Sequence, residues 1–213
     1  MEILKRKPGR PSLSEGQRQE IRDNIIEIAR ELFVNEGYEN TSMRKIAAQA
    51  GFAPTKIYYY FENKKAILRF FWEDISEALW NYCCPPQEIL DGEPLEIIRY
   101  LMNKNVRYWL ENPKSYQLGI VTQDHKADKS ENFDVYAAHG TSNYIKLLHD
   151  SVQRCIDQKV FRITNKLIAA QVISLSVYGI YGAFYSLPTV AWEDRETLVN
   201  TAIDNTLLGL QVQ

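Results

Sequence analysis

The chain has 213 residues, of which 45% are hydrophobic and 24% charged, and its formal net charge is -2. These proportions are typical of folded proteins and exclude a disordered chain. The length allows one large domain or two small ones. The first residues are polar or turn-forming, which argues against a secretory signal and favours a cytoplasmic protein. The three cysteines, at 83, 84 and 155, form neither a disulfide framework nor a paired metal-binding motif.

Positive charge is concentrated at the front of the chain. Residues 1–65 contain 12 Lys+Arg against 9 Asp+Glu, a net of +3, so the remainder, with 13 against 18, carries -5. The most basic stretch is "KRKPGRP" at residues 5–11, with four positive charges and two prolines. A basic front on an acidic body favours a polyanionic partner for the N-terminal part, although ordinary surface charge explains the same numbers.

The first predicted helix follows Ser14, which stands at capping-box spacing from Gln17. Apolar residues then recur three or four positions apart, at Ile21, Ile25, Ile28, Ala29, Leu32 and Phe33. Gly37 is a natural stop. Residues 14–36 therefore predict one amphipathic helix.

Two short helices are predicted next, on either side of a glycine turn. Thr41 or Ser42 can cap "MRKIAAQA", which ends at Gly51, and Pro54 is favoured at the first position of "PTKIYYYF". This layout is typical of a helix-turn-helix, whose second helix enters the DNA major groove.

The rest of the chain also shows helical periodicity. Asn63 caps a longer helix up to residue 83, and residues 84–94 form a link with two adjacent prolines. Further helices are predicted over residues 94–112, 114–124, 133–157, 164–187 and 193–210. Since no alternating strand pattern of useful length occurs, the predicted fold is all-α. The predicted division is a flexible basic arm (1–13), a three-helix helix-turn-helix domain (14–62) and a larger helical domain (63–213) that begins with a connecting helix (63–83).

An uncharged stretch of residues 167–192 is long enough to cross a bilayer. Against a membrane span stand several polar residues within it, Pro188 near its end, and the lack of a basic cluster on either flank. A helix that is apolar on most sides of a soluble protein is buried in its own core or against another subunit. Gly179 and Gly182 allow close approach of a second helix. A subunit interface is the sharper hypothesis, and the residues expected there are Ile168, Val172, Leu175, Gly179 and Gly182.

The stretch "SMRKIAAQAGFAPTKIYYYFENK" resembles the DNA-binding signature of the tetracycline-repressor (TetR) family. The preceding "FVNEGYENTS" and the following "NKKAIL" extend the resemblance over the first third of the chain. It implies an N-terminal DNA-binding domain, a variable helical ligand-binding domain, and a homodimer formed by the last two helices. It further implies a repressor that a small molecule releases from a palindromic operator.

The resemblance assigns DNA contacts to exposed residues of the motif. Arg44, Thr55 and Lys56 are expected to meet bases, whereas Tyr58, Tyr60 and Lys64 are suited to phosphates. Tyr59 is the tyrosine expected to be packed or a bystander. The full predicted set is Lys5, Arg6, Lys7, Arg10, Thr41, Ser42, Arg44, Thr55, Lys56, Tyr58, Tyr60 and Lys64. The motif departs from the family pattern at Ala53, Thr55 and Tyr60, where Ser or Thr, Gly and His are usual.

The basic arm contains a Gly-Arg-Pro core that resembles the minor-groove hook of A/T-binding proteins. We expect Arg10 to lie in a narrow minor groove while Lys5, Arg6 and Lys7 meet phosphates. The alternative is a basic tail that supplies only non-specific attraction.

Aromatic residues of the larger domain could line a pocket for an apolar or aromatic effector, although aromatics at helical spacing also form plain core. The candidate ligand-binding residues are Tyr108, Tyr136, His139 and Tyr178. No cofactor or metal is expected, because the three histidines lack ligand spacing. Cys83 and Cys84 could sense thiol-reactive compounds, but ordinary free cysteines explain them as well.

Two other functions stay open at this point. An enzyme is disfavoured because the chain lacks a nucleophile elbow, a glycine-rich phosphate loop and the common zinc motifs. A ligand-independent architectural or chromosome-organising DNA-binding protein would need neither an enclosed pocket nor discrete palindromic sites.

Overall fold

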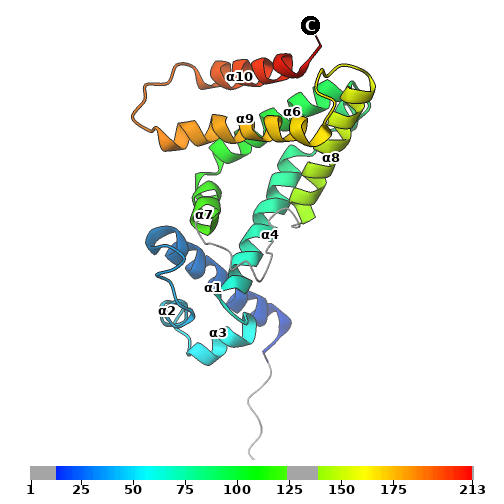
Figure 1. The fold of residues 1–213 in the computed structure, drawn as a ribbon. Coiled ribbons are helices and arrows are strands. Elements are labelled where there is room, and N and C mark those ends of the chain that lie inside the picture. The colour runs from blue at the N-terminus through cyan, green and yellow to red at the C-terminus, as the bar shows by residue number, and fades with distance from the viewer. Residues whose placement is uncertain (1–12, 124–138, 213) are drawn as a thin grey trace, which may run out of the picture. The chain divides into compact units, whose positions relative to one another are not determined.

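The computed structural model describes residues 13–123 and 139–212 and confirms the all-α fold. Within these ranges every regular element is a helix, and Phe161 and Gln211 form one isolated antiparallel bridge. The chain divides into two compact units, Met1–Leu68 and Arg69–Gln213 (Figure 1). The predicted boundary after residue 62 stays a prediction.

In the first unit, α1 (Glu15–Glu36) begins with the predicted capping box. The Gln17 N–H donates to Ser14 Oγ, and the Ser14 N–H donates to Gln17 Oε1 at 3.0 Å. The helix ends at Gly37, whose positive φ of 86° is open to glycine at little cost, and its N–H donates to the Phe33 carbonyl. Local sequence signals therefore set both ends of α1.

The two short helices are α2 (Met43–Gln49) and α3 (Pro54–Tyr60). Ser42 caps α2 by accepting from the Lys45 N–H, while Ala53 offers α3 no side-chain cap and Pro54 occupies its first turn. The turn between them passes through Gly51 at a φ of 70°. The helices are joined through buried apolar side chains, namely Ile46, Ala47, Ile57 and Phe61.

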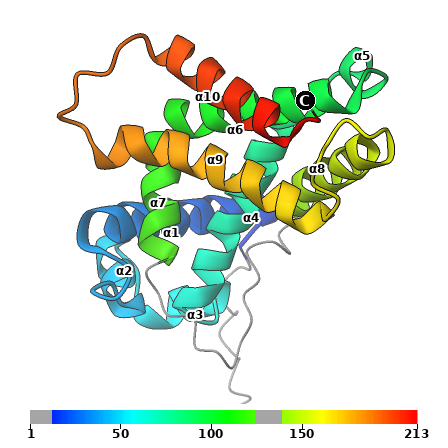
Figure 2. The ribbon, with the colours of Figure 1, turned by 45° about the horizontal axis from the view of Figure 1, so that its top comes forward.

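The chain passes from the first unit to the second within α4 (Lys64–Cys83). The second unit continues with α5 (Gln87–Leu90), α6 (Pro94–Glu111), α7 (Pro113–Gln123), α8 (His139–Asp157), α9 (Lys166–Ser186) and α10 (Arg195–Leu210). Helices α6, α8, α9 and α10 pack on one another, and both views show α9 beside α10 (Figures 1 and 2). Their shared core contains Ile98, Leu101, Met102, Ile173 and Ile203, all of them fully buried.

Several predicted limits move by a few residues. The predicted link at 84–94 contains the short helix α5. Helices α9 and α10 begin after Asn165 and Asp194, each of which caps its helix through a side-chain oxygen. The predicted start of α8 at residue 133 lies outside the described residues.

Within the described residues, α9 is long and apolar enough to cross a membrane by length and composition alone. Only 28% of its most apolar window is buried inside the protein. One face of α9 contributes to the core through Ala169, Ile173 and Val177, so the helix is a packed element of the second unit.

The three cysteines differ in accessibility, and this predicts their reactivity. Cys83 and Cys155 are buried and Cys84 is exposed. Burial raises the pKa of the Cys83 thiol to about 12 and that of Cys155 to about 11, so neither forms much reactive thiolate at pH 8. Ellman's reagent at pH 8 is expected to modify Cys84 rapidly in the native protein, and the other two thiols only after unfolding.

The control for this measurement is the Cys84→Ser variant, which should show no rapid phase. Fast modification of Cys84→Ser in native buffer would mean that the core around Cys83 or Cys155 is open to solvent.

Candidate nucleic-acid interface and ligand cavity

The first turns of α2 and α3 present two exposed side chains that make no polar contact elsewhere in the protein. Arg44 is the second residue of α2 and Thr55 the second residue of α3. Across the part of the chain that the structure describes, neither has a hydrogen-bond or ion-pair partner. Both are therefore free to bind an external group, as the sequence predicts for base-reading residues.

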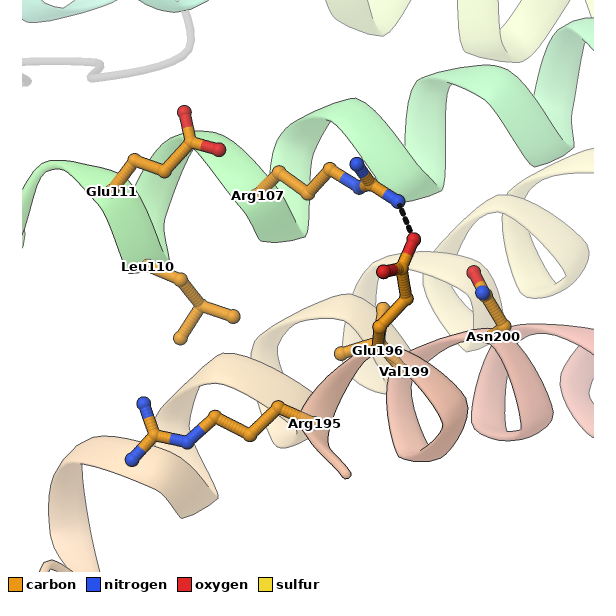
Figure 3. A pocket seen from close by; sticks show the side chains of 7 residues that line it. All are labelled: Arg107, Leu110, Glu111, Arg195, Glu196, Val199 and Asn200. Atoms are coloured by element: carbon orange, nitrogen blue, oxygen red, sulfur yellow. Dashed lines mark hydrogen bonds and ion pairs between the residues drawn. The ribbon is translucent and has the colours of Figure 1, made fainter. Parts of the chain in front are cut away.

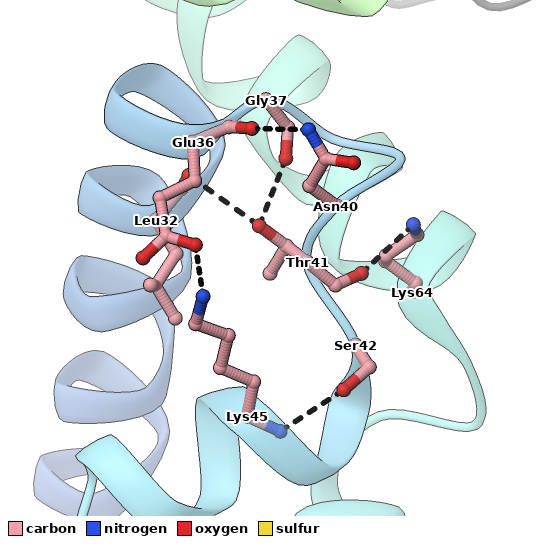
Figure 4. Close-up of polar contacts among 8 residues, drawn as sticks. All are labelled: Leu32, Glu36, Gly37, Asn40, Thr41, Ser42, Lys45 and Lys64. Carbon is pink, nitrogen blue, oxygen red and sulfur yellow. Dashed lines mark hydrogen bonds and ion pairs between the residues drawn. The ribbon is translucent and has the colours of Figure 1, made fainter.

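Thr41 occupies the interior instead of the surface. Its side chain is 1% exposed, and Oγ1 donates to the Gly37 carbonyl at 2.9 Å (Figure 4). The hydroxyl of the neighbouring Ser42 caps the N-terminus of α2. The predicted DNA contact by the Thr41 side chain is thus unsupported, because a buried hydroxyl that closes a loop cannot also reach a phosphate.

Lys64 holds the same loop from the other side. Its Nζ donates to the carbonyls of Tyr38 at 2.5 Å and Thr41 at 2.9 Å, and it lies 3.9 Å from the centre of the Tyr38 ring. Burial lowers the pKa of the Lys64 ammonium, and the Glu39 carboxylate partly opposes this. Burial also raises the pKa of the Tyr38 hydroxyl to about 12. The predicted phosphate ligand Lys64 is therefore engaged in closing the loop after α1.

The three consecutive tyrosines of α3 differ in exposure. Tyr58 and Tyr59 are 52% and 68% exposed, so Tyr59 is not packed. Tyr60 is half-buried, its hydroxyl oxygen is enclosed without a partner among the described residues, and its ring stands edge-on to Tyr59. The helix thus offers Tyr58 and Tyr59 to solvent, and Tyr60 does not present the hydroxyl that a phosphate contact needs.

Two lysines near the motif contact other groups. Lys56, a predicted base contact, places its ammonium 3.8 Å from the centre of the Phe52 ring, in the turn before α3. Lys45 forms an ion pair with Glu36, the last residue of α1 (Figure 4). The pair connects α2 to the end of α1, and no short-range spacing in the sequence predicts it.

The predicted arm residues Lys5, Arg6, Lys7 and Arg10 lie outside the described residues, so their role stays a prediction.

The second unit contains a cavity of about 860 Å³ between α4, α6, α7, α8 and α9. This volume lies within the usual range of ligand pockets. Aromatic rings supply much of its described lining, which includes Trp72, Trp109, Tyr116, Tyr144, Tyr178 and Tyr181. Aliphatic side chains and neutral polar groups supply most of the remainder.

Of the predicted ligand-binding residues, the structure places Tyr178 at this cavity. Tyr108 is 5% exposed and belongs to the core, and the lining residue is its neighbour Trp109. The Tyr108 prediction chose the wrong one of two adjacent aromatics, because only tertiary packing decides which of them faces the cavity. Tyr136 lies outside the described residues, as does the side chain of His139.

A smaller pocket of about 210 Å³ lies between α6 and α10 (Figure 3). Arg107 and Glu196 form an ion pair across it at 2.7 Å, and Arg195 lies 5.2 Å from the centre of the Phe184 ring. Glu111 accepts a hydrogen bond from the Tyr82 hydroxyl at 2.7 Å. The charged groups are thus engaged within the protein, and the volume is below that of a typical ligand site. Within the described ranges, no cluster of His, Cys, Asp and Glu could hold a metal ion.

The predicted subunit interface lies on the outer side of α9. Ile168 is 49% and Leu175 71% exposed. Gly179 is exposed, and a side chain added there would meet no atom within 4 Å, whereas Val172 and Gly182 are half-buried. On α10, Leu198 and Leu208 are also exposed. Exposed apolar side chains on both helices are consistent with the predicted interface, which stays a prediction.

Comparison with known proteins finds a family match within the first unit. Residues 25–69 match the family described as bacterial regulatory proteins, tetR family. The chain is also 30% identical over 84 residues to the HTH-type transcriptional regulator AcrR of Shigella flexneri. That match spans 39% of this chain and 39% of the relative's length.

Solved structures resemble the whole fold. A TetR family transcription regulator from Marinobacter aquaeolei VT8 has a TM-score of 0.69 at 16% identity, covering 94% of this chain and 100% of its own. NalD, the secondary repressor of the MexAB-OprM multidrug efflux pump in Pseudomonas aeruginosa, has a TM-score of 0.67 at 19% identity, covering 92% and 98%. The fatty acid degradation regulator FadR of Bacillus halodurans has a TM-score of 0.68 at 19% identity, covering 95% and 100%.

The geometry around Lys64 predicts a structural role for this side chain. Lys64→Met removes two charge-assisted hydrogen bonds, which the ammonium donates to loop carbonyls. Backbone amides of residues 37–42 are therefore expected to exchange with deuterium on the order of tenfold faster than in the wild type. The intact protein is labelled, and the exchange is read from its peptides by mass spectrometry. Arg44→Ala is the matched control, since Arg44 has no partner within the described chain, and unchanged exchange in Lys64→Met would contradict the role.

Proposed function

This chain belongs to the TetR family of bacterial regulatory proteins, and we propose that it is a sequence-specific DNA-binding transcriptional repressor that a small molecule releases from its operator. The observation that carries the proposal is the helix-turn-helix of α2 and α3, which the family match covers. Their first turns present Arg44 and Thr55, which have no polar partner among residues 13–123 and 139–212 and are available to an external ligand.

The DNA-binding surface follows from these exposed side chains. A recognition helix inserts its N-terminal residues into the major groove, which assigns base contacts to Thr55 and Lys56 of α3 and to Arg44 at the start of α2. The hydroxyl of Tyr58 is suited to a phosphate. Tyr59 joins this set because it is the most exposed of the three tyrosines.

The cavity of the second unit is the proposed effector site. Its volume and aromatic lining suit a small organic molecule. Helix α4 contributes Trp72, Ile75, Ser76 and Leu79 to the cavity, and its first residue is Lys64, which holds the loop before α2. A ligand that favours one position of α4 would shift the population of DNA-binding states through this continuous helix. The names of NalD and FadR describe regulators of efflux and fatty acid degradation, and they support control of this kind.

The proposed assembly is a homodimer in which the outer faces of α9 and α10 meet those of a second copy. Ile168 and Leu175 on α9 and Leu198 and Leu208 on α10 supply apolar area that one chain leaves uncovered. A two-fold dimer carries two recognition helices and fits a palindromic operator with half-sites about 34 to 36 Å apart. Binding to chromosomal DNA places the protein in the cytoplasm, and the proposal assigns it no catalytic reaction.

The alternative is an architectural DNA-binding protein that answers to no ligand, which the basic stretch at residues 5–11 favours. An architectural protein does not require a cavity of about 860 Å³, and this favours the ligand-controlled regulator.

Arg44 provides a test of base reading. The wild-type chain and Arg44→Ala are each used to select binding sites from a library of random duplex DNA. The wild type is expected to enrich an inverted repeat, and Arg44→Ala to lose discrimination at one base pair of each half-site, worth about 1–3 kcal/mol. Tyr58→Phe is the control, because losing a phosphate contact should weaken binding without altering the motif. An unchanged motif with Arg44→Ala would refute its assignment.

Leu175 provides a test of the dimer. Leu175→Asp puts a charge on the apolar face of α9 and is expected to convert the dimer to a monomer in light scattering. Its affinity for the inverted repeat should fall by about 100-fold or more, since two linked contacts become one. Leu13→Asp changes an exposed leucine outside this face and should leave the mass unchanged. A dimer that survives Leu175→Asp would place the interface elsewhere.

A further inference from the structure

The cavity of the second unit is large, and the ionisable side chains of its described lining are those of tyrosines and His149. None of the described residues that line it is Asp, Glu, Lys or Arg. A small ion enclosed there would lose its hydration without gaining an opposite charge, and such burial is costly. The lining therefore selects on the charge of a ligand before it selects on shape.

Tyr144 and Tyr181 of the lining do not ionise at neutral pH. Burial raises the pKa of the Tyr144 hydroxyl well above its ordinary value, and burial together with Tyr178 does the same for Tyr181. Both phenols stay protonated at neutral pH. They act as neutral hydrogen-bonding groups toward whatever enters the cavity.

One cluster of rings comes from α6, α7 and α9. The rings of Tyr116 and Tyr181 are nearly perpendicular, with their centres 5.6 Å apart, and the ring centres of Trp109 and Tyr181 are 5.9 Å apart. Tyr178 extends the cluster, with its ring centre 5.4 Å from that of Tyr181. Rings held by one another in this way keep their orientation and offer a preformed surface to a flat apolar molecule.

Neutral polar groups are also present in the lining. Asn105, which is 8% exposed, makes a side-chain hydrogen bond with Tyr144, and the Tyr144 hydroxyl lies 3.5 Å from the Leu101 carbonyl. Ser174 donates to the Ala170 carbonyl of its own helix and keeps acceptor capacity for a ligand. A carbonyl or hydroxyl of a ligand can be matched by these groups, whereas a full charge cannot.

We infer that the effector of this regulator is an uncharged molecule with a flat ring system and a neutral hydrogen-bonding group, which Asn105 and Tyr144 recognise. Organic anions and cations of the same skeleton are excluded. The inference rests on the proposed function only in taking this cavity as the effector site. It separates the chain from sensors whose ligand carries a carboxylate or a phosphate, which need a cationic side chain in the pocket.

Cations need separate consideration, because aromatic faces attract them. Here the Tyr116 ring stands edge-to-face with those of Trp109 and Tyr181, the Trp109 and Tyr181 rings are tilted against each other, and no carboxylate occurs among the described lining residues to balance a positive charge. A quaternary ammonium compound is thus expected to bind more weakly than its neutral counterpart.

The test uses three probes that share one ring skeleton. N-phenyl-1-naphthylamine is neutral, 1-anilinonaphthalene-8-sulfonate is its anionic counterpart, and a trimethylammonium derivative is cationic. Binding to the full-length protein is followed by fluorescence titration and calorimetry at pH 8. The neutral probe is expected to bind one site per chain at least tenfold more tightly than either ion.

Equal or tighter binding of the anion or the cation would overturn the inference, and so would a lack of saturable binding by the neutral probe. The site is identified with Asn105→Leu, which should lower affinity for a hydroxylated derivative of the neutral probe more than for the parent compound. Equal losses for both compounds would refute the role of Asn105.

A second variant tests the charge argument by reversing it. Gln171 lines the cavity and is exposed, so Gln171→Arg can fold while adding a guanidinium to the lining. It is expected to raise affinity for the sulfonate at least tenfold relative to the wild type. Gln117→Arg on α7 adds the same charge at an exposed position outside the cavity lining and is the matched control. No gain in Gln171→Arg, or the same gain in the control, would contradict the inference.

The measurements keep this inference separate from the proposed function. Retention of duplex DNA by the unliganded protein, and its loss on adding a saturating neutral probe, test the ligand-released repressor. Probe selectivity tests only the chemistry of the cavity, so either claim can fail while the other stands.

Discussion

The ammonium group of Lys64, held between the carbonyls of Tyr38 and Thr41, closes the loop on which the DNA-binding unit depends. Buried backbone carbonyls need partners, and this loop finds them in a lysine from α4 and in the hydroxyl of Thr41. The loop in turn delivers Ser42 to the N-terminus of α2. Because these polar groups are used inside the unit, the groups left for DNA are Arg44, Thr55, Lys56 and the exposed tyrosines of α3.

The second unit depends on apolar packing instead of polar contacts. Its cavity is surrounded by rings and aliphatic side chains, and the charged residues Arg107 and Glu196 pair with each other at the surface instead. The apolar side of α9 that faces the interior forms the core, while Leu175 on its other side stays exposed. One apolar helix thus serves a core, a cavity wall and the proposed contact with a second chain.

The sequence predicted most reliably what local interactions determine. The capping box at Ser14 and the uncapped start of α3 at Ala53 were correct, since they depend on residues a few positions apart. The family resemblance was confirmed for the same reason, because its motif is contiguous. Residue type alone shows neither that the Thr41 hydroxyl is buried and donates to the Gly37 carbonyl, nor that Lys64 binds carbonyls more than 20 residues before it in the chain, so their DNA contacts stay predictions.

Neighbouring aromatics were the other limit. Successive residues of a helix point in different directions, so the sequence shows that Tyr58, Tyr59 and Tyr60 diverge without showing which one is packed. The same holds for Tyr108 and Trp109, where only the arrangement of α6 against α7 and α9 shows which ring lines the cavity. The described lining, which contains no Asp, Glu, Lys or Arg, combines residues from five helices, and no short motif could reveal it.

Operator binding is tested by selecting fragmented genomic DNA with the purified protein at near-physiological salt and sequencing the retained fragments. Recovery of a few sites that share an inverted repeat is the result expected for a dimeric operator-binding regulator. Broad recovery of A/T-rich DNA without a repeat would contradict operator binding and favour an architectural protein. Retention of no DNA would contradict DNA binding by this chain.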